Sequence, residues 1–305
     1  MTAYKYWAFG LQIESEIEFP ELFPSTFEHA DLKISLGITP SELTGDKVVQ
    51  KVNVTMSPDE YIIRIVNVAN YYAAHGNQII VEAASETDEK SIRLFLLSNA
   101  MAAILHQRDM SPFHASAVFC EGGLALFCGR SGAGKSTLAT ALQLKGYKVF
   151  SDDVCVLKPS EDNNELLAYT SYPMIKLWED SFEKVGLDTA SQEDQIRPDM
   201  AKYARFYHED FDIQAYPVKY VFVLDPDSQV KVTEIEKLPS LTAFTKLQRN
   251  SYRYVQMNAM NKRNVHFSVI SKLSATQVYQ ISRPGIGNTI EDVIRLVESK
   301  LTVHA

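Results

Sequence analysis

The sequence predicts an α/β fold built from two units, and three observations support this prediction. Residues 1–88 carry alternating and β-branched apolar runs separated by turn signals, as a β-rich unit does. A glycine-rich segment at 129–136 lies between a short apolar run and a helical stretch. Further on, a strand-like apolar run at 218–224 precedes two helical segments. We therefore expect an N-terminal β-rich unit over 1–88 and an α/β unit over 89–305.

The composition is that of an ordinary globular protein. The chain has 305 residues, of which 46% are hydrophobic and 22% are charged, so wholesale disorder is excluded. The net charge of −8 argues against nucleic acid as the main partner, because phosphate backbones require clustered Lys and Arg. The start of the chain lacks the apolar core of a signal peptide, and the longest apolar stretch, 94–105, is too short to span a bilayer. Cys120, Cys128 and Cys155 have no metal-type spacing and suit buried thiols in a reducing compartment. We expect a cytoplasmic protein with no nucleic-acid or membrane partner.

The N-terminal unit shows strand patterns but no catalytic constellation. Residues 32–36 alternate between apolar and polar side chains, and 61–66 and 78–81 are β-branched runs separated by a turn region that contains Gly76 and Asn77. Substrate docking, oligomerisation and shielding of the core all remain open as roles for this unit. A homo-oligomer is therefore compatible with the sequence.

A helix is predicted to link the two units over residues 89–108. Its apolar positions recur at helical spacing. Asp88 and Glu89 at its start suit the positive end of the helix dipole.

Residues 129–136 follow the phosphate-binding pattern GxxxxGK[ST] without a mismatch. The apolar run 124–128 predicts a strand before this loop, and 137–145 predicts a helix after it. Such a strand, loop and helix direct successive backbone N–H groups and the positive helix end at one anion. In this arrangement Lys135 would reach the β- and γ-phosphates of a nucleoside triphosphate, and the Ser136 hydroxyl would ligate Mg²⁺. The predicted nucleotide-binding residues are Gly129, Arg130, Ser131, Gly132, Ala133, Gly134, Lys135, Ser136 and Thr137.

A β-hairpin is predicted over residues 114–128, with its turn at 121–123. Counting back from the turn places His114 opposite Gly129, at the mouth of the phosphate loop. A histidine at a strand end is usually structural. Because this one is expected beside the γ-phosphate, we interpret it as a functional residue.

Asp152 and Asp153 follow an apolar run at 147–151. A strand that ends in Asp is typical of the metal-holding strand in phosphate-loop proteins, and the distance from Lys135 suits a neighbouring strand. One Asp of the pair can hold the metal, and the other can accept a proton from an incoming hydroxyl. Since a simple ATPase has less need for two adjacent carboxylates, the pair favours a kinase.

The later segments are less informative. Residues 194–208 have the composition of a mobile loop or lid, and an ordinary exposed loop fits equally well. Residues 218–224 predict a buried strand, and 240–253 and 289–301 predict helices. The sequence does not rank four cations that could clamp a phosphate: Lys176, Arg249, Arg253 and Arg283.

The motifs at 113–115, 129–136 and 151–153 resemble the catalytic domain of bacterial HPr kinase/phosphorylase and its relatives. His114 lies 21 residues before the loop lysine, and the Asp pair lies 17 and 18 residues after it. The resemblance implies a phosphate-loop core of the HPr kinase C-terminal domain type that phosphorylates a serine hydroxyl. It also implies that Asp153 is the base, that Asp152 assists with the metal and that His114 lies near the transferred phosphate.

The sequence departs from the HPr-specific enzymes at Thr137, where those enzymes usually carry an acidic residue, and over its first hundred residues. Their characteristic C-terminal segment is also not recognisable. The layout is more similar to HPr-kinase-related proteins, some of which phosphorylate a serine of a lasso-peptide precursor. We therefore predict an ATP- and Mg²⁺-dependent serine kinase whose partner is a peptide or protein. The alternatives are a bifunctional HPr kinase/phosphorylase and a nucleotide-gated binding module.

Overall fold

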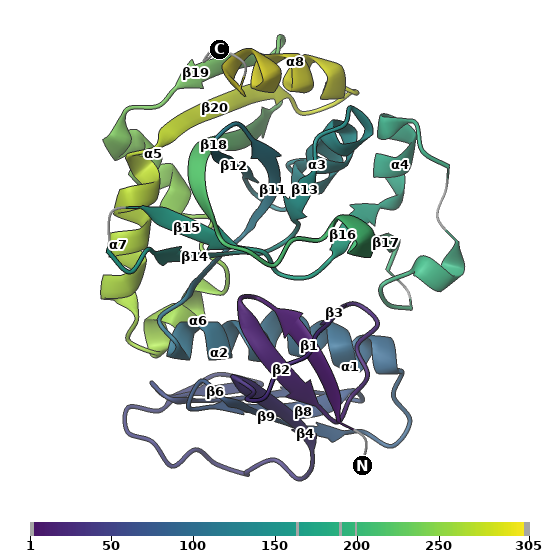
Figure 1. Cartoon of the computed structure of the whole chain (residues 1–305), viewed down its shortest axis with the longest axis vertical. Coiled ribbons are helices and arrows are strands. Elements are labelled where there is room, and N and C mark those ends of the chain that lie inside the picture. The colour runs from purple at the N-terminus through teal and green to yellow at the C-terminus, as the bar shows by residue number, and fades with distance from the viewer. Residues whose placement is uncertain (1–2, 163–164, 189–190, 199, 302–305) are drawn as a thin grey trace.

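The N-terminal residues form a nine-stranded sheet in a computed structural model that describes residues 3–162, 165–188, 191–198 and 200–301 (Figure 1). The strand order is β3-β1-β2-β4-β9-β8-β7-β6-β5. The strands are β1 (Tyr4–Ala8), β2 (Leu11–Ser15), β3 (Phe23–Pro24), β4 (Leu32–Leu36), β5 (Val49–Gln50), β6 (Val54–Met56), β7 (Glu60–Ile65), β8 (Ala69–Ala74) and β9 (Gln78–Ala83). The strands predicted near 32–36, 61–66 and 78–81 are confirmed. Strand β8 was not predicted, because alanine is depleted in strands and half of this strand is alanine.

A continuous helical segment follows this sheet and confirms the predicted helix. It consists of α1 (Glu89–Phe95), a π-helical turn (Leu96–Ala100) and α2 (Met101–Gln107). The Asp88 carboxylate caps α1 by accepting a hydrogen bond from the Ser91 backbone N–H at 2.8 Å. Figure 1 shows the segment between the N-terminal sheet and the rest of the molecule. Most of its buried apolar residues share one hydrophobic core with the N-terminal strands and with Val156 and Met174 from later in the chain. The division into units at residue 88 stays a prediction.

A second nine-stranded sheet lies in the remainder of the chain. Its main order is β10-β14-β15-β18-β12-β11-β13, and β20 pairs with both β18 and β19. Strands β12, β18 and β20 are parallel to one another, whereas β11 is antiparallel to β12. The strands are β10 (Ser111–Phe113), β11 (Ala115–Cys120), β12 (Gly123–Cys128), β13 (Val149–Ser151), β14 (Cys155–Pro159), β15 (Leu166–Tyr169), β18 (Tyr216–Asp227), β19 (Glu234–Lys237) and β20 (Gln277–Pro284). A separate hairpin consists of β16 (Met174–Trp178) and β17 (Lys202–Phe206).

Helices cover both faces of this sheet, and β12 lies buried between them (Figure 1). Along β12, Leu124, Leu126 and Cys128 pack into the core that holds α5 and α7, whereas Ala125 and Phe127 pack into the core that holds α3 and α8. This alternation is what a central strand with two covered faces requires. The helices are α3 (Lys135–Leu144), α4 (Glu179–Val185), α5 (Ser240–Gln248), α6 (Tyr254–Ala259), α7 (Arg263–Ser274) and α8 (Ile290–Leu301). The chain is therefore a mixed α/β protein with large sheets.

Two later segments differ from the sequence-based expectation. The helix expected over 240–253 ends at Gln248, because Asn250 turns its side chain back to the Lys246 carbonyl and Arg253 takes a left-handed backbone conformation. Part of the expected loop at 194–208 is strand β17, which pairs with β16. The strand at 218–224 and the final helix are confirmed.

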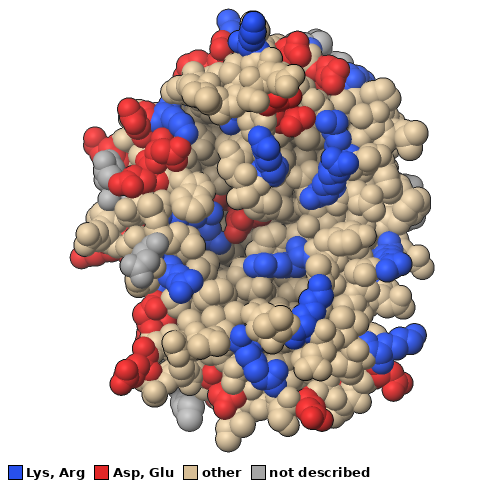
Figure 2. Space-filling view, turned by 180° about the vertical axis from the view of Figure 1, so that it is seen from behind, with Lys and Arg blue, Asp and Glu red and all other residues tan. Residues whose placement is uncertain are grey.

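Charge is distributed unevenly over the surface although the chain carries a net charge of −8. On the face shown in Figure 2, Lys and Arg side chains gather around a central hollow, and Asp and Glu side chains lie mostly toward the rim. Among the described residues, no helix combines the length and the apolar character needed to cross a membrane. The three cysteines are free thiols, and two of them are buried as expected.

Candidate functional site

The phosphate-binding pattern lies where a buried strand meets a helix, as predicted. Strand β12 ends at Cys128 and α3 begins at Lys135. Only glycine fits at position 129, where φ is 148° and a Cβ atom would lie 2.5 Å from the Leu224 carbonyl oxygen. Gly134 precedes α3 with a φ of 95°, and no side chain caps the first turn of the helix. The first N–H groups of α3 are therefore available to an anion bound at the loop.

Three distant segments hold the loop in place. The Gly129 N–H donates to the Asn250 side-chain oxygen at 2.8 Å. The Arg130 guanidinium donates to the Pro226 carbonyl at 2.6 Å, and the Arg283 guanidinium donates to the Ala133 carbonyl at 3.0 Å. The loop is thus fastened to the connection between α5 and α6, to the end of β18 and to the end of β20.

The Lys135 side chain folds back over the loop. Its Nζ atom donates to the carbonyls of Gly129 at 3.0 Å and Arg130 at 3.3 Å. Burial lowers the pKa of Lys135, an effect that the nearby carboxylates of Asp152 and Asp153 only partly offset. The Lys135 ammonium is therefore already shielded from water and lies within the loop whose bound phosphates it would contact.

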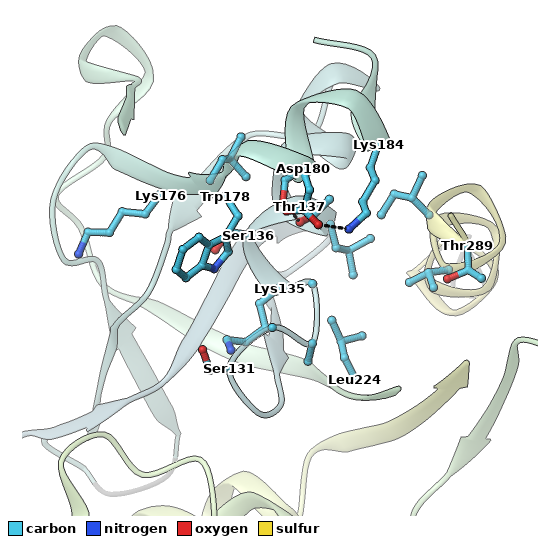
Figure 3. Close-up of a pocket in the computed structure, with 18 of the residues that line it drawn as sticks. Ser131, Lys135, Ser136, Thr137, Lys176, Trp178, Asp180, Lys184, Leu224 and Thr289 are labelled. Atoms are coloured by element: carbon cyan, nitrogen blue, oxygen red, sulfur yellow. Dashed lines mark hydrogen bonds and ion pairs between the residues drawn. The ribbon is translucent and has the colours of Figure 1, made fainter. Parts of the chain in front are cut away.

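A pocket surrounds the loop and the start of α3 (Figure 3). Ser136 and Thr137 line it, and the Thr137 hydroxyl donates to Ser181 at 3.0 Å. The Asp180–Lys184 ion pair, Trp178 and Thr289 contribute to its wall. The predicted site residues that line the pocket are His114, Ser131, Gly132, Ala133, Gly134, Lys135, Ser136, Thr137 and Asp153. Of the other predicted residues, Gly129 and Arg130 line a neighbouring groove.

Asp153 directs its carboxylate to this pocket. It lies 2.9 Å from Lys176 Nζ and 3.5 Å from His114 Nδ1. Burial by itself would raise the pKa of Asp153, but the positive charges of Lys176 and Lys202 outweigh burial and hold the pKa well below its ordinary value. Asp153 is therefore fully ionised at neutral pH.

Asp152 has different surroundings, although it is the adjacent residue. It is almost fully buried and does not line the pocket. Its Oδ1 accepts the Ser116 hydroxyl at 2.6 Å, and its Oδ2 accepts the backbone N–H of Lys176 at 2.9 Å. The carboxylate thus joins β11 to β16. The metal role stays a prediction.

His114 occupies the position that the hairpin register predicted. Ala115 pairs with Cys128 in this antiparallel hairpin. His114, which precedes Ala115, and Gly129, which follows Cys128, therefore lie at the same end of the two strands. The His114 Nδ1 atom lies 2.8 Å from the Asp153 carbonyl oxygen. Because a carbonyl can only accept, Nδ1 carries the proton and Nε2 is left as an acceptor. Burial, together with the charge of Lys135, lowers the pKa of His114, so the ring is neutral at pH 7.

The structure separates the four cations that the sequence left unranked. Lys176 and Arg283 line the pocket of the phosphate loop, whereas Arg249 and Arg253 line the adjoining groove. Sequence reasoning missed the contact between Lys176 and Asp153 and the anchoring role of Asn250. A lysine within an apolar strand was the available signal for Lys176, and no local signal marked Asn250.

The donors in the pocket are compatible with Mg²⁺. The Ser136 hydroxyl and the Asp153 carboxylate line the same pocket. Magnesium in phosphate-transfer sites commonly takes one or two protein oxygens and completes its shell with substrate phosphates and water. Among the described residues, no cluster of three or more His, Cys, Asp or Glu side chains forms a self-contained metal site.

No protein-family model and no curated protein sequence matches the chain. The solved structures that are similar to it include the HPr(Ser) kinase/phosphatase from Coxiella burnetii. That similarity has 16% identity and a TM-score of 0.34, and it covers 62% of this chain and 95% of the other. A similarity this weak carries no functional argument. The fold is that of a mixed α/β protein with large sheets, and residues 131–137 line a pocket at the start of α3.

Proposed function

We propose that this protein is an ATP- and Mg²⁺-dependent kinase that transfers the γ-phosphate to a serine hydroxyl of a peptide or protein. The observation that carries the proposal is the meeting of three features in one pocket: a glycine loop with an uncapped helix start, the buried Lys135, and the ionised Asp153 paired with Lys176. Phosphoryl transfer needs charge neutralisation and an oriented nucleophile, and these features supply both.

The loop would bind the nucleotide phosphates. The N–H groups at the start of α3 donate to the β-phosphate, and Lys135 turns from the Gly129 and Arg130 carbonyls toward the β- and γ-phosphates. The Ser136 hydroxyl is the proposed protein ligand of Mg²⁺, and the bound ion would neutralise part of the negative charge of the nucleotide phosphates. Asp152 keeps its two hydrogen bonds and holds β16, and thereby Lys176, in place.

Asp153 would act as the base. The serine hydroxyl oxygen attacks the γ-phosphorus while the bond to the bridging oxygen of ADP breaks, and the hydroxyl proton moves to the Asp153 carboxylate. While Lys176 is paired with it, Asp153 is a weak base because its pKa is held low. The γ-phosphate brings negative charge into the same pocket and competes for Lys176. Shifting the ammonium toward the phosphate would make Asp153 more basic and stabilise the transferred group at once.

The test is incubation of the protein with γ-labelled ATP, Mg²⁺ and serine-containing peptides. Label on serine supports the kinase, whereas release of free phosphate alone supports the nucleotide-gated module. Removal of the label by added inorganic phosphate supports the bifunctional kinase/phosphorylase. The cytoplasmic location, the lack of nucleic-acid and membrane partners and the homo-oligomer stay predictions.

A further inference from the structure

A second groove adjoins the phosphate loop. It is lined by the start of the loop, by the end of β18 and by residues 246 and 249–253 around the connection between α5 and α6. His114 and Ser131 line both this groove and the nucleotide pocket. The two hollows therefore meet at the mouth of the loop, where an acceptor hydroxyl has to approach the γ-phosphate.

The groove is strongly basic. Its lining carries four cations, Arg130, Lys246, Arg249 and Arg253, and among the described residues that line it Asp225 is the single carboxylate. Lys246 lies 3.5 Å from Asp225 and neutralises it. The guanidinium of Arg253 stacks on the Tyr252 ring at 5.3 Å.

Three of these cations have no carboxylate to neutralise them within the part of the chain that the structure describes. Within the described residues, Arg130 donates to the Pro226 carbonyl and Arg253 to the Ser98 carbonyl. Arg249 is exposed, and it forms no ion pair with any residue that the structure describes. A planar guanidinium offers two parallel N–H donors, which match the two oxygens of a carboxylate.

The wall of the groove is held rigidly against the loop by Asn250. Its side-chain oxygen accepts the Gly129 N–H at 2.8 Å, and its amide nitrogen donates to the Lys246 carbonyl at 3.0 Å. Its backbone carbonyl accepts the His114 N–H at 2.9 Å. A segment bound in the groove would therefore meet charges at a set position relative to the γ-phosphate, which reduces the entropic cost of binding.

We propose that this groove binds peptide segments in which Asp or Glu residues flank the serine that accepts the phosphate, an inference that rests on the kinase function proposed above. The charges favour an acidic peptide over a nucleic acid. A phosphate backbone would extend beyond this short groove onto a protein with a net charge of −8, whereas an acidic peptide presents its charge only where the arginines lie.

The test is fluorescence anisotropy with three labelled peptides of equal length, each with one serine flanked by acidic, neutral or basic residues. We expect the acidic peptide to bind at least about tenfold more tightly than the neutral one at low salt, and this preference to shrink as ionic strength rises. Arg249→Glu should weaken binding of the acidic peptide about tenfold, because attraction becomes repulsion. Lys148→Glu is the matched control: it makes the same charge change on an exposed lysine beyond the far end of α3, and binding should stay unchanged.

Equal affinities for the acidic and neutral peptides, or equal losses of affinity for the acidic peptide in Arg249→Glu and Lys148→Glu, would overturn the inference. Tighter binding of a single-stranded oligonucleotide of the same charge would overturn it as well. Because anisotropy needs no phosphoryl transfer, the two proposals can fail separately. Peptide binding that depends on Arg249, with no label on serine, would reject the proposed kinase activity and support the proposed peptide-binding groove. Equal labelling of the acidic and neutral peptides would reject the proposed preference of the groove for acidic peptides and support the proposed kinase activity.

Discussion

The ion pair between Asp153 and Lys176 allows a quantitative test of the site. The two charged groups lie 2.9 Å apart, and the exposed fractions of the side chains are 21% for Asp153 and 6% for Lys176. Asp153→Asn removes the charge but preserves the shape. Asparagine also tolerates the left-handed backbone at this position, where φ is 66°. The substitution therefore leaves a nearly buried ammonium without its partner and adds little backbone strain.

The expected cost follows from the burial. Breaking a fully buried pair from one side costs about 3–5 kcal/mol. Since Asp153 keeps some contact with water, we expect Asp153→Asn to lower the free energy of unfolding by about 2–3 kcal/mol. Lys176→Met leaves the more exposed partner behind and should cost about 1–2 kcal/mol. The double variant leaves no unpaired charge, so its cost should fall below the sum of the two single costs by about 1–3 kcal/mol.

Urea unfolding of the four proteins measures these costs, and transfer from γ-labelled ATP measures activity. Asp153→Asn should retain nucleotide binding but lose about 10²–10⁴-fold in transfer, the contribution typical of a general base. If the loss of unfolding free energy in the Asp153→Asn, Lys176→Met double variant equals the sum of the two single losses, the interaction between the two charges is refuted. Transfer by Asp153→Asn at the unsubstituted rate would refute its role as the base.

Four further predictions concern the same fold and site. Lys135→Ala should weaken nucleotide binding and abolish transfer, and unchanged turnover would contradict the loop assignment. Asp152→Asn should lower the free energy of unfolding by about 1–3 kcal/mol, because a buried hydrogen bond is lost. It should reduce phosphoryl transfer less than Asp153→Asn does, and the opposite result would exchange the roles of these two residues. The pKa of His106 is lowered to about 4 by burial, so the unfolded chain takes up a proton first as the pH falls. The shift at His106 alone should lower the free energy of unfolding by about 3 kcal/mol between pH 6.5 and 4, and urea titrations of His106→Gln should show a total drop that is smaller by this amount. Gly129→Ala should destabilise the protein more than Gly132→Ala, because its Cβ would meet a carbonyl oxygen at 2.5 Å whereas position 132 is open.

The phosphate loop could be read from the sequence because its parts are contiguous. Strand, loop and helix follow one another over residues 123–144, and each is determined by local preference: buried apolar residues, glycines with positive φ, and a helix-forming run. The place of His114 was predictable for a related reason. A tight turn sets the register of a hairpin, so counting residues is enough.

Contacts between distant segments could not be read in this way. Lys176 lies 23 residues from Asp153, and Asn250 lies 121 residues from Gly129. Such contacts depend on the order of the strands and on which helix covers which face, and neither leaves a local pattern. The end of α5 at Gln248 depends in the same way on Asn250, which turns toward the loop.

The sequence by itself determined that a glycine-rich loop joins a buried strand to a helix, which residues form this loop, and that a histidine and an acidic pair lie near it. Only the tertiary structure distinguished the two acids. Adjacent residues can point in opposite directions, so Asp152 joins two strands within the core while Asp153 faces the pocket. The partner that sets the charge state of Asp153 comes from another strand, and its position depends on how the whole chain packs.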